Sequence, residues 1–97
     1  MQYFIASSQL NVNTFVDYIL IKAGVNCRAG HVQLETVQSV NECSAACSNI
    51  AGCEFFIYHV EGEYCYWIKT STASCPEGFD RSSYNFYGLI RGKFSAF

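Results

Sequence analysis

The chain has 97 residues, a formal net charge of −2 and six cysteines; 51% of its residues are hydrophobic and only 14% are charged. This composition excludes an intrinsically disordered chain, and so short a chain predicts one domain. The six basic residues are scattered, so no basic stripe is present to bind nucleic acid or an anionic membrane. A high, even number of cysteines is typical of disulfide-linked proteins from an oxidising, extracellular compartment.

The N-terminal part of the chain contains no predicted membrane segment. Its most apolar stretch, residues 15–25, is interrupted by Asp17 and Lys22 and is shorter than the roughly 18–20 residues that span a bilayer. Residues 2–10 lack the basic start and continuous apolar run of a signal peptide. We therefore expect a mature chain, or a fragment, whose export signal is not part of this sequence.

Two strands are predicted before the middle of the chain. Residues 15–22 are rich in β-branched and aromatic side chains, and Ala23-Gly24 is expected to end this first strand. The second strand is predicted over residues 31–37, where Val32, Leu34 and Thr36 alternate with polar residues. The alternation indicates that one face of the second strand is buried.

A helix is predicted to begin at Val40. Residues 39–42 have the S-x-x-E form of a capping box, in which Ser39 caps an early amide and Glu42 reaches back toward the chain before the helix. The apolar positions of the helix are spaced three and four residues apart and therefore share one face. They are Val40, Cys43, Ala46, Cys47 and Ile50. Gly52 is expected to stop the helix.

A β-hairpin is predicted after the helix. Residues 53–59 and 64–69 form two aromatic, β-branched runs that flank a turn at residues 60–63. This turn places His59 opposite Tyr64, Tyr58 opposite Cys65 and Phe56 opposite Trp67. A slip of one residue would exchange the two faces of the hairpin.

Metal binding and catalysis are both poorly supported by the residue pattern. The two histidines, His31 and His59, are interpreted as a strand-edge residue and a hairpin residue, and the spacing of the cysteines lacks the close C-x2-C pairs of zinc sites. No nucleophile elbow, H-E-x-x-H motif or glycine-rich phosphate loop occurs. We therefore expect no catalytic residue, no metal and no cofactor.

The central motifs resemble those of the PAN/apple domain family. They are Glu42-Cys-x3-Cys47 on the predicted helix, Gly52-Cys-x-Phe-Phe-x-Tyr58 on the first hairpin strand and Gly62-x-x-Cys-Tyr-Trp-x-Lys69 on the second. The resemblance covers about residues 15–89. Trp67 stands where the family more often has leucine, so the core is expected to be larger there.

The resemblance implies an α+β fold in which a small antiparallel sheet is crossed by one helix. It also implies the disulfides Cys43–Cys65, Cys47–Cys53 and Cys27–Cys75, one of the fifteen pairings that six cysteines allow. Residues 1–97 are then one domain with a core of about residues 15–90 and apolar arms at residues 1–14 and 91–97. PAN/apple domains mediate protein–protein and protein–carbohydrate contacts without catalysis, so the resemblance implies a secreted or cell-surface interaction module.

The implied Cys43–Cys65 bridge turns one face of the hairpin toward the helix. The opposite face is then strongly apolar and needs a cover. It is our candidate interface and consists of Phe55, Ile57, Tyr64, Tyr66 and Ile68.

The sequence leaves three alternatives for what covers this face. The chain's own ends supply one, through residues 3–5, residues 84–90 or Phe94. A second copy of the chain, joined through the apolar arms, is another. The third is an extracellular protein or glycan that packs on the tyrosines.

These alternatives lead to two functional hypotheses. The preferred one is a self-assembling structural subunit of a surface or fibrous assembly, and the alternative is a monomeric lectin-like or protein-binding adhesin module cut from a longer secreted protein. The expected partners are copies of the chain or extracellular protein or glycan, with no nucleic acid and no membrane insertion. The hydroxyl-rich loop at Thr70, Ser71 and Thr72 is a candidate for O-linked glycosylation.

Overall fold

The computed structural model describes residues 17–90, which form eight helices and strands around two hydrophobic clusters. The elements are β2 (Tyr18–Lys22), β3 (Val25–Cys27), β4 (His31–Gln33), α2 (Val40–Ser48), β5 (Phe55–His59), β6 (Cys65–Ile68), β7 (Phe79–Arg81) and β8 (Tyr84–Leu89). Five strands form one antiparallel sheet in the order β2-β8-β5-β6-β4, and β3 and β7 form a second, two-stranded antiparallel sheet. The fold is therefore the expected α+β arrangement.

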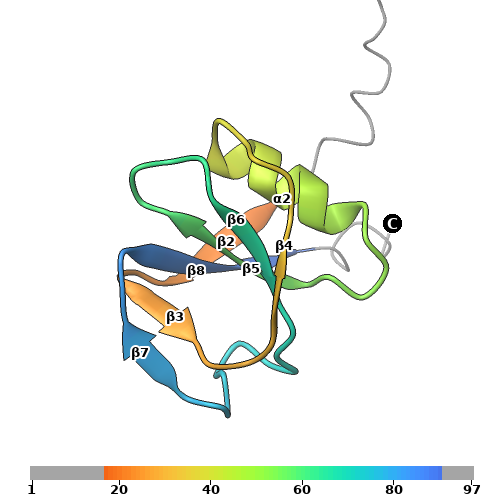
Figure 1. The fold of residues 1–97 in the computed structure, drawn as a ribbon. Coiled ribbons are helices and arrows are strands. Elements are labelled where there is room, and N and C mark those ends of the chain that lie inside the picture. Colours follow the sequence, from red (N-terminus) through yellow and green to blue (C-terminus); the bar gives the residue numbers. More distant parts are fainter. Residues whose placement is uncertain (1–16, 91–97) are drawn as a thin grey trace, which may run out of the picture.

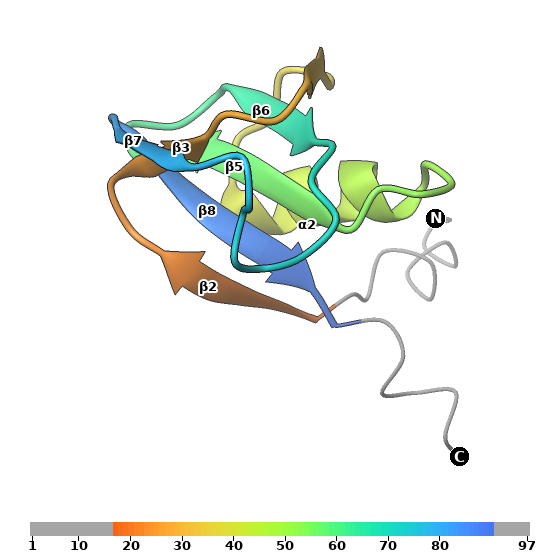
Figure 2. The same ribbon diagram turned by 90° about the horizontal axis from the view of Figure 1, so that it is seen from below.

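Helix α2 lies across one face of the five-stranded sheet, and the β3–β7 pair lies away from it (Figures 1 and 2). The first of the two hydrophobic clusters, here called cluster one, joins the sheet to the β3–β7 pair. The second, here called cluster two, joins the sheet to α2. The sheet thus has a helix side and an opposite side, and each packs on a different partner.

The start of α2 confirms the predicted capping box. The Ser39 hydroxyl accepts the amide of Glu42 at 3.2 Å, and the Glu42 carboxylate accepts the amide of Gln38 at 2.8 Å. The first bond satisfies an amide of the first helical turn, which otherwise has no partner within the helix, and the second holds the residue that precedes the N-cap. Cys43, Ala46 and Cys47 are buried toward the sheet, as their spacing predicted.

The hairpin register is also confirmed. Phe56 lies opposite Trp67, Ile57 opposite Tyr66 and Tyr58 opposite Cys65 in the antiparallel β5–β6 pair. The turn leaves His59 beside Tyr64, with the His59 amide donating to the Tyr64 carbonyl at 3.1 Å. The faces of the hairpin therefore point as the sequence predicted.

Three disulfides connect the elements, in the pairings that the family resemblance implies. Cys43–Cys65 joins α2 to β6, and Cys47–Cys53 joins α2 to the segment that leads into β5. Cys27–Cys75 joins β3 to the loop before β7. The two inner bridges lie in cluster two and the outer bridge lies in cluster one.

Two strand expectations need correction. The strand predicted over residues 31–37 ends at Gln33, after which Leu34 donates its amide to the Cys65 carbonyl and Val37 makes an isolated bridge to Glu63. Residues 84–90 do not cover the sheet as one alternative proposed, because β8 lies within it between β2 and β5. Alternating apolar residues suit a strand within the sheet as well as a segment that covers it. Only the pairing with distant strands decides between these two positions.

The remaining expectations about the chain ends fall largely outside the described residues. The first predicted strand appears as Tyr18–Lys22, and its residues 15 and 16 are not described. The arms at residues 1–14 and 91–97 also lie outside the described part, as do residues 3–5 and Phe94, which were offered as a cover. Within residues 17–90, no helix is long and apolar enough to cross a membrane.

Gly88 provides a test of the packing on the opposite side of the sheet. A Cβ atom at this buried position on β8 would lie 3.0 Å from Ile21 Cδ1 and 3.3 Å from the Phe55 ring. We expect Gly88→Ala to lower the free energy of unfolding by about 1–3 kcal/mol, because both neighbours must move in a filled core.

The control is Gly30→Ala, whose Cβ would meet only the Lys69 side chain at 3.9 Å. Both variants are compared with the wild type by guanidinium denaturation of the oxidised protein. Equal stability of the two variants would contradict the packing described for Gly88.

Candidate ligand-binding surface

The side of the sheet opposite α2 is divided into a covered half and an open half. The β3–β7 pair and the Cys27–Cys75 bridge, here called the covering lobe, pack on the covered half. Val25, Cys27 and Cys75 of the lobe share a cluster with residues of the central strands. The chain therefore supplies its own cover for part of this face, but from a segment that the sequence analysis did not consider.

The candidate interface is consequently only partly correct. Ile57 and Ile68 are 1% and 0% exposed, so they are core residues under the covering lobe. Phe55 and Tyr66 are partly buried against the same cluster, whereas Tyr64 is 48% exposed. The register gave the correct face, but it did not reveal that a separate two-stranded sheet closes half of it.

A continuous row of aromatic rings crosses the open half. The order is His31, Tyr66, Tyr84, His59 and Tyr64, here called the aromatic row. Neighbouring ring centroids lie 6.0, 6.0, 5.0 and 5.9 Å apart in that order. Most neighbours meet edge to face, an arrangement that aromatic rings favour.

Strand register explains why these rings meet. His59 lies opposite Tyr84 in the β5–β8 pair and beside Tyr64 at the hairpin turn. Tyr66 lies opposite Gln33 and is two residues along β6 from Ile68, which lies opposite His31, so Tyr66 and His31 are on the same face. Residues opposite one another share a face of the sheet, so all five rings project to the side away from α2.

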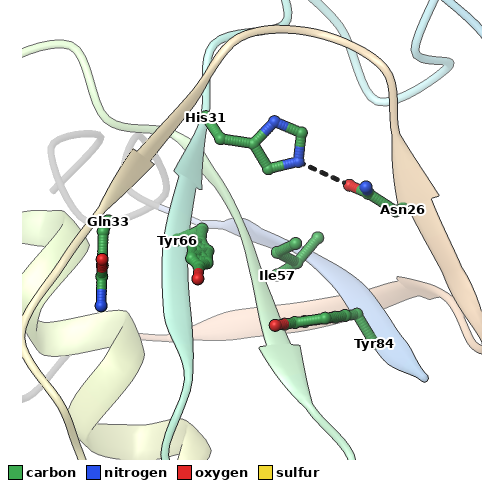
Figure 3. Close-up of a pocket in the computed structure, with 6 residues that line it drawn as sticks. All are labelled: Asn26, His31, Gln33, Ile57, Tyr66 and Tyr84. Carbon is green, nitrogen blue, oxygen red and sulfur yellow. Dashed lines mark hydrogen bonds between the residues drawn. The ribbon is translucent and has the colours of Figure 1, made fainter. Parts of the chain in front are cut away.

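A pocket of about 470 Å³ occupies one end of the aromatic row. Its lining combines rings, side-chain amides and an apolar floor, and consists of Asn26, His31, Gln33, Ile57, Tyr66 and Tyr84. Figure 3 shows Asn26 reaching from β3 toward His31, while Tyr84 points from β8 toward Tyr66. The covering lobe thus forms one wall of the pocket through Asn26.

The histidines of the row are held by specific hydrogen bonds. His31 Nε2 lies 2.8 Å from Asn26 Oδ1, which fixes the ring between β4 and the covering lobe. His59 Nδ1 accepts the Glu61 amide at 3.2 Å, so the neutral ring carries its proton on Nε2. His31 is thus held by a residue of another strand, whereas His59 is held by the turn that follows its own strand.

The hydroxyl of Tyr84 is shielded in this arrangement. Burial raises the pKa of Tyr84 above the usual value, and the nearby Tyr66 phenol, which also hydrogen-bonds to Tyr84, raises it further. Burial likewise raises the pKa of Tyr18 on the helix side. Tyr84 is therefore a neutral hydrogen-bonding group across the physiological range.

Three of the described cations are engaged away from the pocket. Lys22 Nζ lies 5.7 Å from the centre of the Phe79 ring, and Lys69 Nζ lies 5.2 Å from the centre of the Trp67 ring. Arg28 pairs with Asp80 at 2.9 Å on the covering lobe, and its hydrogen bonds lower the pKa of that carboxyl. No lysine, arginine or carboxylate lines the pocket.

The metal-ligating groups in the described part of the chain do not form a usable metal site. Cys27, Cys75 and Glu77 are the one cluster found in residues 17–90. The two sulfur atoms are bonded to each other, so neither is available as a thiolate ligand.

The hydroxyl-rich loop lies apart from the aromatic row. Thr70 donates to Glu77 at 2.7 Å, whereas Ser71 and Thr72 are exposed. The Thr72 and Ser74 hydroxyls lie 2.7 Å apart. The O-linked glycosylation of Thr70, Ser71 and Thr72 stays a prediction.

The arrangement is a five-stranded antiparallel sheet crossed by one helix, with one disulfide from the helix to β6 and a second to the segment before β5. It defines a small disulfide-linked α+β domain. The family model for the PAN domain matches residues 13–89, most of the chain. The chain therefore belongs to the PAN domain family. No characterised protein and no solved structure shows significant similarity to it.

Four pocket residues were not predicted from the sequence as site residues: Asn26, His31, Gln33 and Tyr84. His31 was interpreted only as a strand-edge residue. Gln33 had a usable signal, because it is a polar residue on an alternating strand and its neighbours Val32 and Leu34 point the other way. Asn26 had none, since its place depends on how the covering lobe folds back. Tyr84 was noted only as part of a possible cover.

The phenol of Tyr84 gives a test of this geometry. We expect its ionisation midpoint to lie above about 10, the ordinary value for tyrosine, because burial and Tyr66 disfavour the phenolate. A group with a raised folded-state pKa contributes stability below its unfolded pKa and loses it as pH rises through the folded value. The stability of the domain should therefore fall in the alkaline range.

The measurement is an NMR titration of the tyrosine ring carbons, with Tyr84 assigned by the loss of its signal in Tyr84→Phe. The alkaline loss of stability should be smaller in this variant. Ionisation of Tyr84 at or below the ordinary value would contradict the shielded position of its hydroxyl.

Proposed function

We propose that this PAN domain is a non-catalytic extracellular module that binds a ligand on the aromatic row. PAN domains are known as protein and carbohydrate interaction modules. The observation that carries the proposal is the row itself, five neighbouring rings on the open half of the sheet with a pocket at one end. Such a surface suits the flat face of a sugar or an aromatic-rich protein contact.

The chemistry of the row supports binding over catalysis. Tyrosine and histidine combine apolar ring faces with polar edges, and they lose little conformational entropy when they contact a ligand. The pocket volume of about 470 Å³ falls in the range of small-molecule sites. No cysteine, serine or carboxylate lines the pocket. The imidazole in the lining therefore has no neighbouring nucleophile to activate and no carboxylate partner.

An extracellular location is part of the same proposal. All six cysteines are paired, and three disulfides in a domain of this size are typical of proteins in oxidising compartments. The ligand would then be an extracellular protein or glycan.

Self-association is a second candidate, and strand β2 is the feature that favours it. β2 is an edge strand of the five-stranded sheet, and its neighbouring residues Ile19 and Leu20 are 54% and 50% exposed. Their positions alternate, so both faces of the strand carry exposed apolar surface. An edge of this kind pairs readily with another strand, although the bulge between Leu20 and Lys22 shortens the regular part.

Replacement of Tyr64 tests the role of the aromatic row. Tyr64 is an exposed residue at one end of the row, so Tyr64→Ala removes contact area without opening the core. We expect about tenfold weaker binding to whichever ligand the wild-type domain captures from a glycan array or a panel of extracellular-matrix proteins, because interface tyrosines commonly contribute more than about 1 kcal/mol.

The matched control is Leu20→Ala on edge strand β2, a half-exposed residue that lies opposite Tyr87 on the helix side of the sheet and should bind these probes as the wild type does. Equal affinities of Tyr64→Ala and the wild type would contradict the proposal. So would a failure of the wild type to bind either kind of probe.

The edge-strand candidate is tested by Ile19→Lys. A charge at this position should prevent strand addition, because it would have to be buried in the new interface. If the wild type forms dimers or larger particles in light scattering across a concentration series, the variant should remain monomeric. A wild type that stays monomeric at high concentration, or a variant that associates equally, would contradict self-association through β2.

A further inference from the structure

We infer that the pocket at the end of the aromatic row accepts an uncharged saccharide and discriminates against sulfated and sialylated ones. The inference rests on the proposed function, since it names the class of ligand for the same surface. It is carried by the polar groups that line the pocket and by the positions of the charged side chains around it.

The polar groups of the pocket match sugar hydroxyls. Gln33 projects from β4 beside Tyr66, and its side-chain amide has no hydrogen-bond partner among the described residues (Figure 3). Asn26 uses Oδ1 toward His31, which leaves its NH2 group as a donor. An amide offers a donor and an acceptor side by side, which suits a pair of neighbouring hydroxyls that each donate and accept.

The apolar groups of the pocket match a sugar ring. Ile57 lies at the floor, and the Tyr66 and Tyr84 rings lie beside it with centroids 6.0 Å apart. The C–H face of a pyranose would pack on these rings while its hydroxyls reach the amides. No lysine, arginine or carboxylate lines the pocket, so the lining presents dipoles and no fixed charge.

The pocket lining offers no cation that would compensate an anionic ligand. Lys22, Arg28 and Lys69 are held against Phe79, Asp80 and Trp67, respectively. At the other end of the row, exposed Glu61 and Glu63 belong to the turn that carries the His59 hydrogen bond. A sulfate or carboxylate would therefore lose its hydration without meeting a cation, and desolvation of an uncompensated charge is costly.

The test compares neutral oligosaccharides with their sulfated and sialylated derivatives on the same array, using the oxidised wild-type chain at one fixed pH. We expect binding to neutral members only. The affinity should change by less than about twofold between low and high salt, because screening acts on charge interactions.

Two variants assign the binding to the pocket. Gln33→Ala should weaken binding about fivefold to tenfold through the loss of its hydrogen bonds, whereas the control Gln38→Ala, an exposed glutamine before α2, should not. A thermal melt of each variant shows whether the fold is retained. Equal binding by Gln33→Ala and the wild type would overturn the inference.

Other outcomes separate this inference from the proposed function. Binding of sulfated or sialylated members that is lost in Tyr64→Ala would overturn the choice of an uncharged ligand and leave the aromatic row as the binding surface. Binding of matrix proteins alone, again lost in Tyr64→Ala, would do the same. Loss of neutral-sugar binding in Gln33→Ala but not in Tyr64→Ala would support the pocket and remove the rest of the row from the site.

Discussion

The Cys43–Cys65 disulfide is the constraint on which the orientation of the sheet depends. It joins the buried face of α2 to β6, and the register then places Tyr58 opposite Cys65 on the same side. Because side chains alternate along a strand, this one bridge directs Tyr64 and Tyr66 to the other side of the sheet. The location of the aromatic row therefore follows from a covalent bond on the face that it does not occupy.

The outer disulfide has a different consequence, because it limits how much of that second face stays open. Cys27–Cys75 holds the covering lobe over Ile57 and Ile68. The hydrogen bond between Asn26 and His31 marks the border between the lobe and the open half of the face. An apolar sheet face left entirely open would favour nonspecific association. The lobe removes its most aliphatic part from solvent and leaves the rings, which carry polar edges. The same segment forms a wall of the pocket.

Local signals in the sequence predicted much of the fold. They did not predict which segments that are distant in sequence lie side by side. The capping box at Ser39 and the hairpin turn involve residues that are close in sequence, so the start of α2 and the pairing of Phe56 with Trp67 followed from the spacing alone. The place of β8 in the sheet and the path of the lobe depend on contacts between distant segments. For that reason two of the five predicted interface residues, Ile57 and Ile68, lie in the core, and Asn26 was not predicted as a pocket residue.

The most direct measurement of the central claim is chemical-shift mapping of the isotope-labelled, oxidised domain during titration with a neutral oligosaccharide selected from an array. The ring and backbone signals of Tyr64, Tyr66 and Tyr84 should shift together and saturate at one dissociation constant, along with the Gln33 side-chain amide. Signals on the helix side, such as those of Tyr18 and Trp67, should remain unchanged. Shifts confined to the helix side, or to strand β2, would contradict the assignment of the aromatic row as the binding surface.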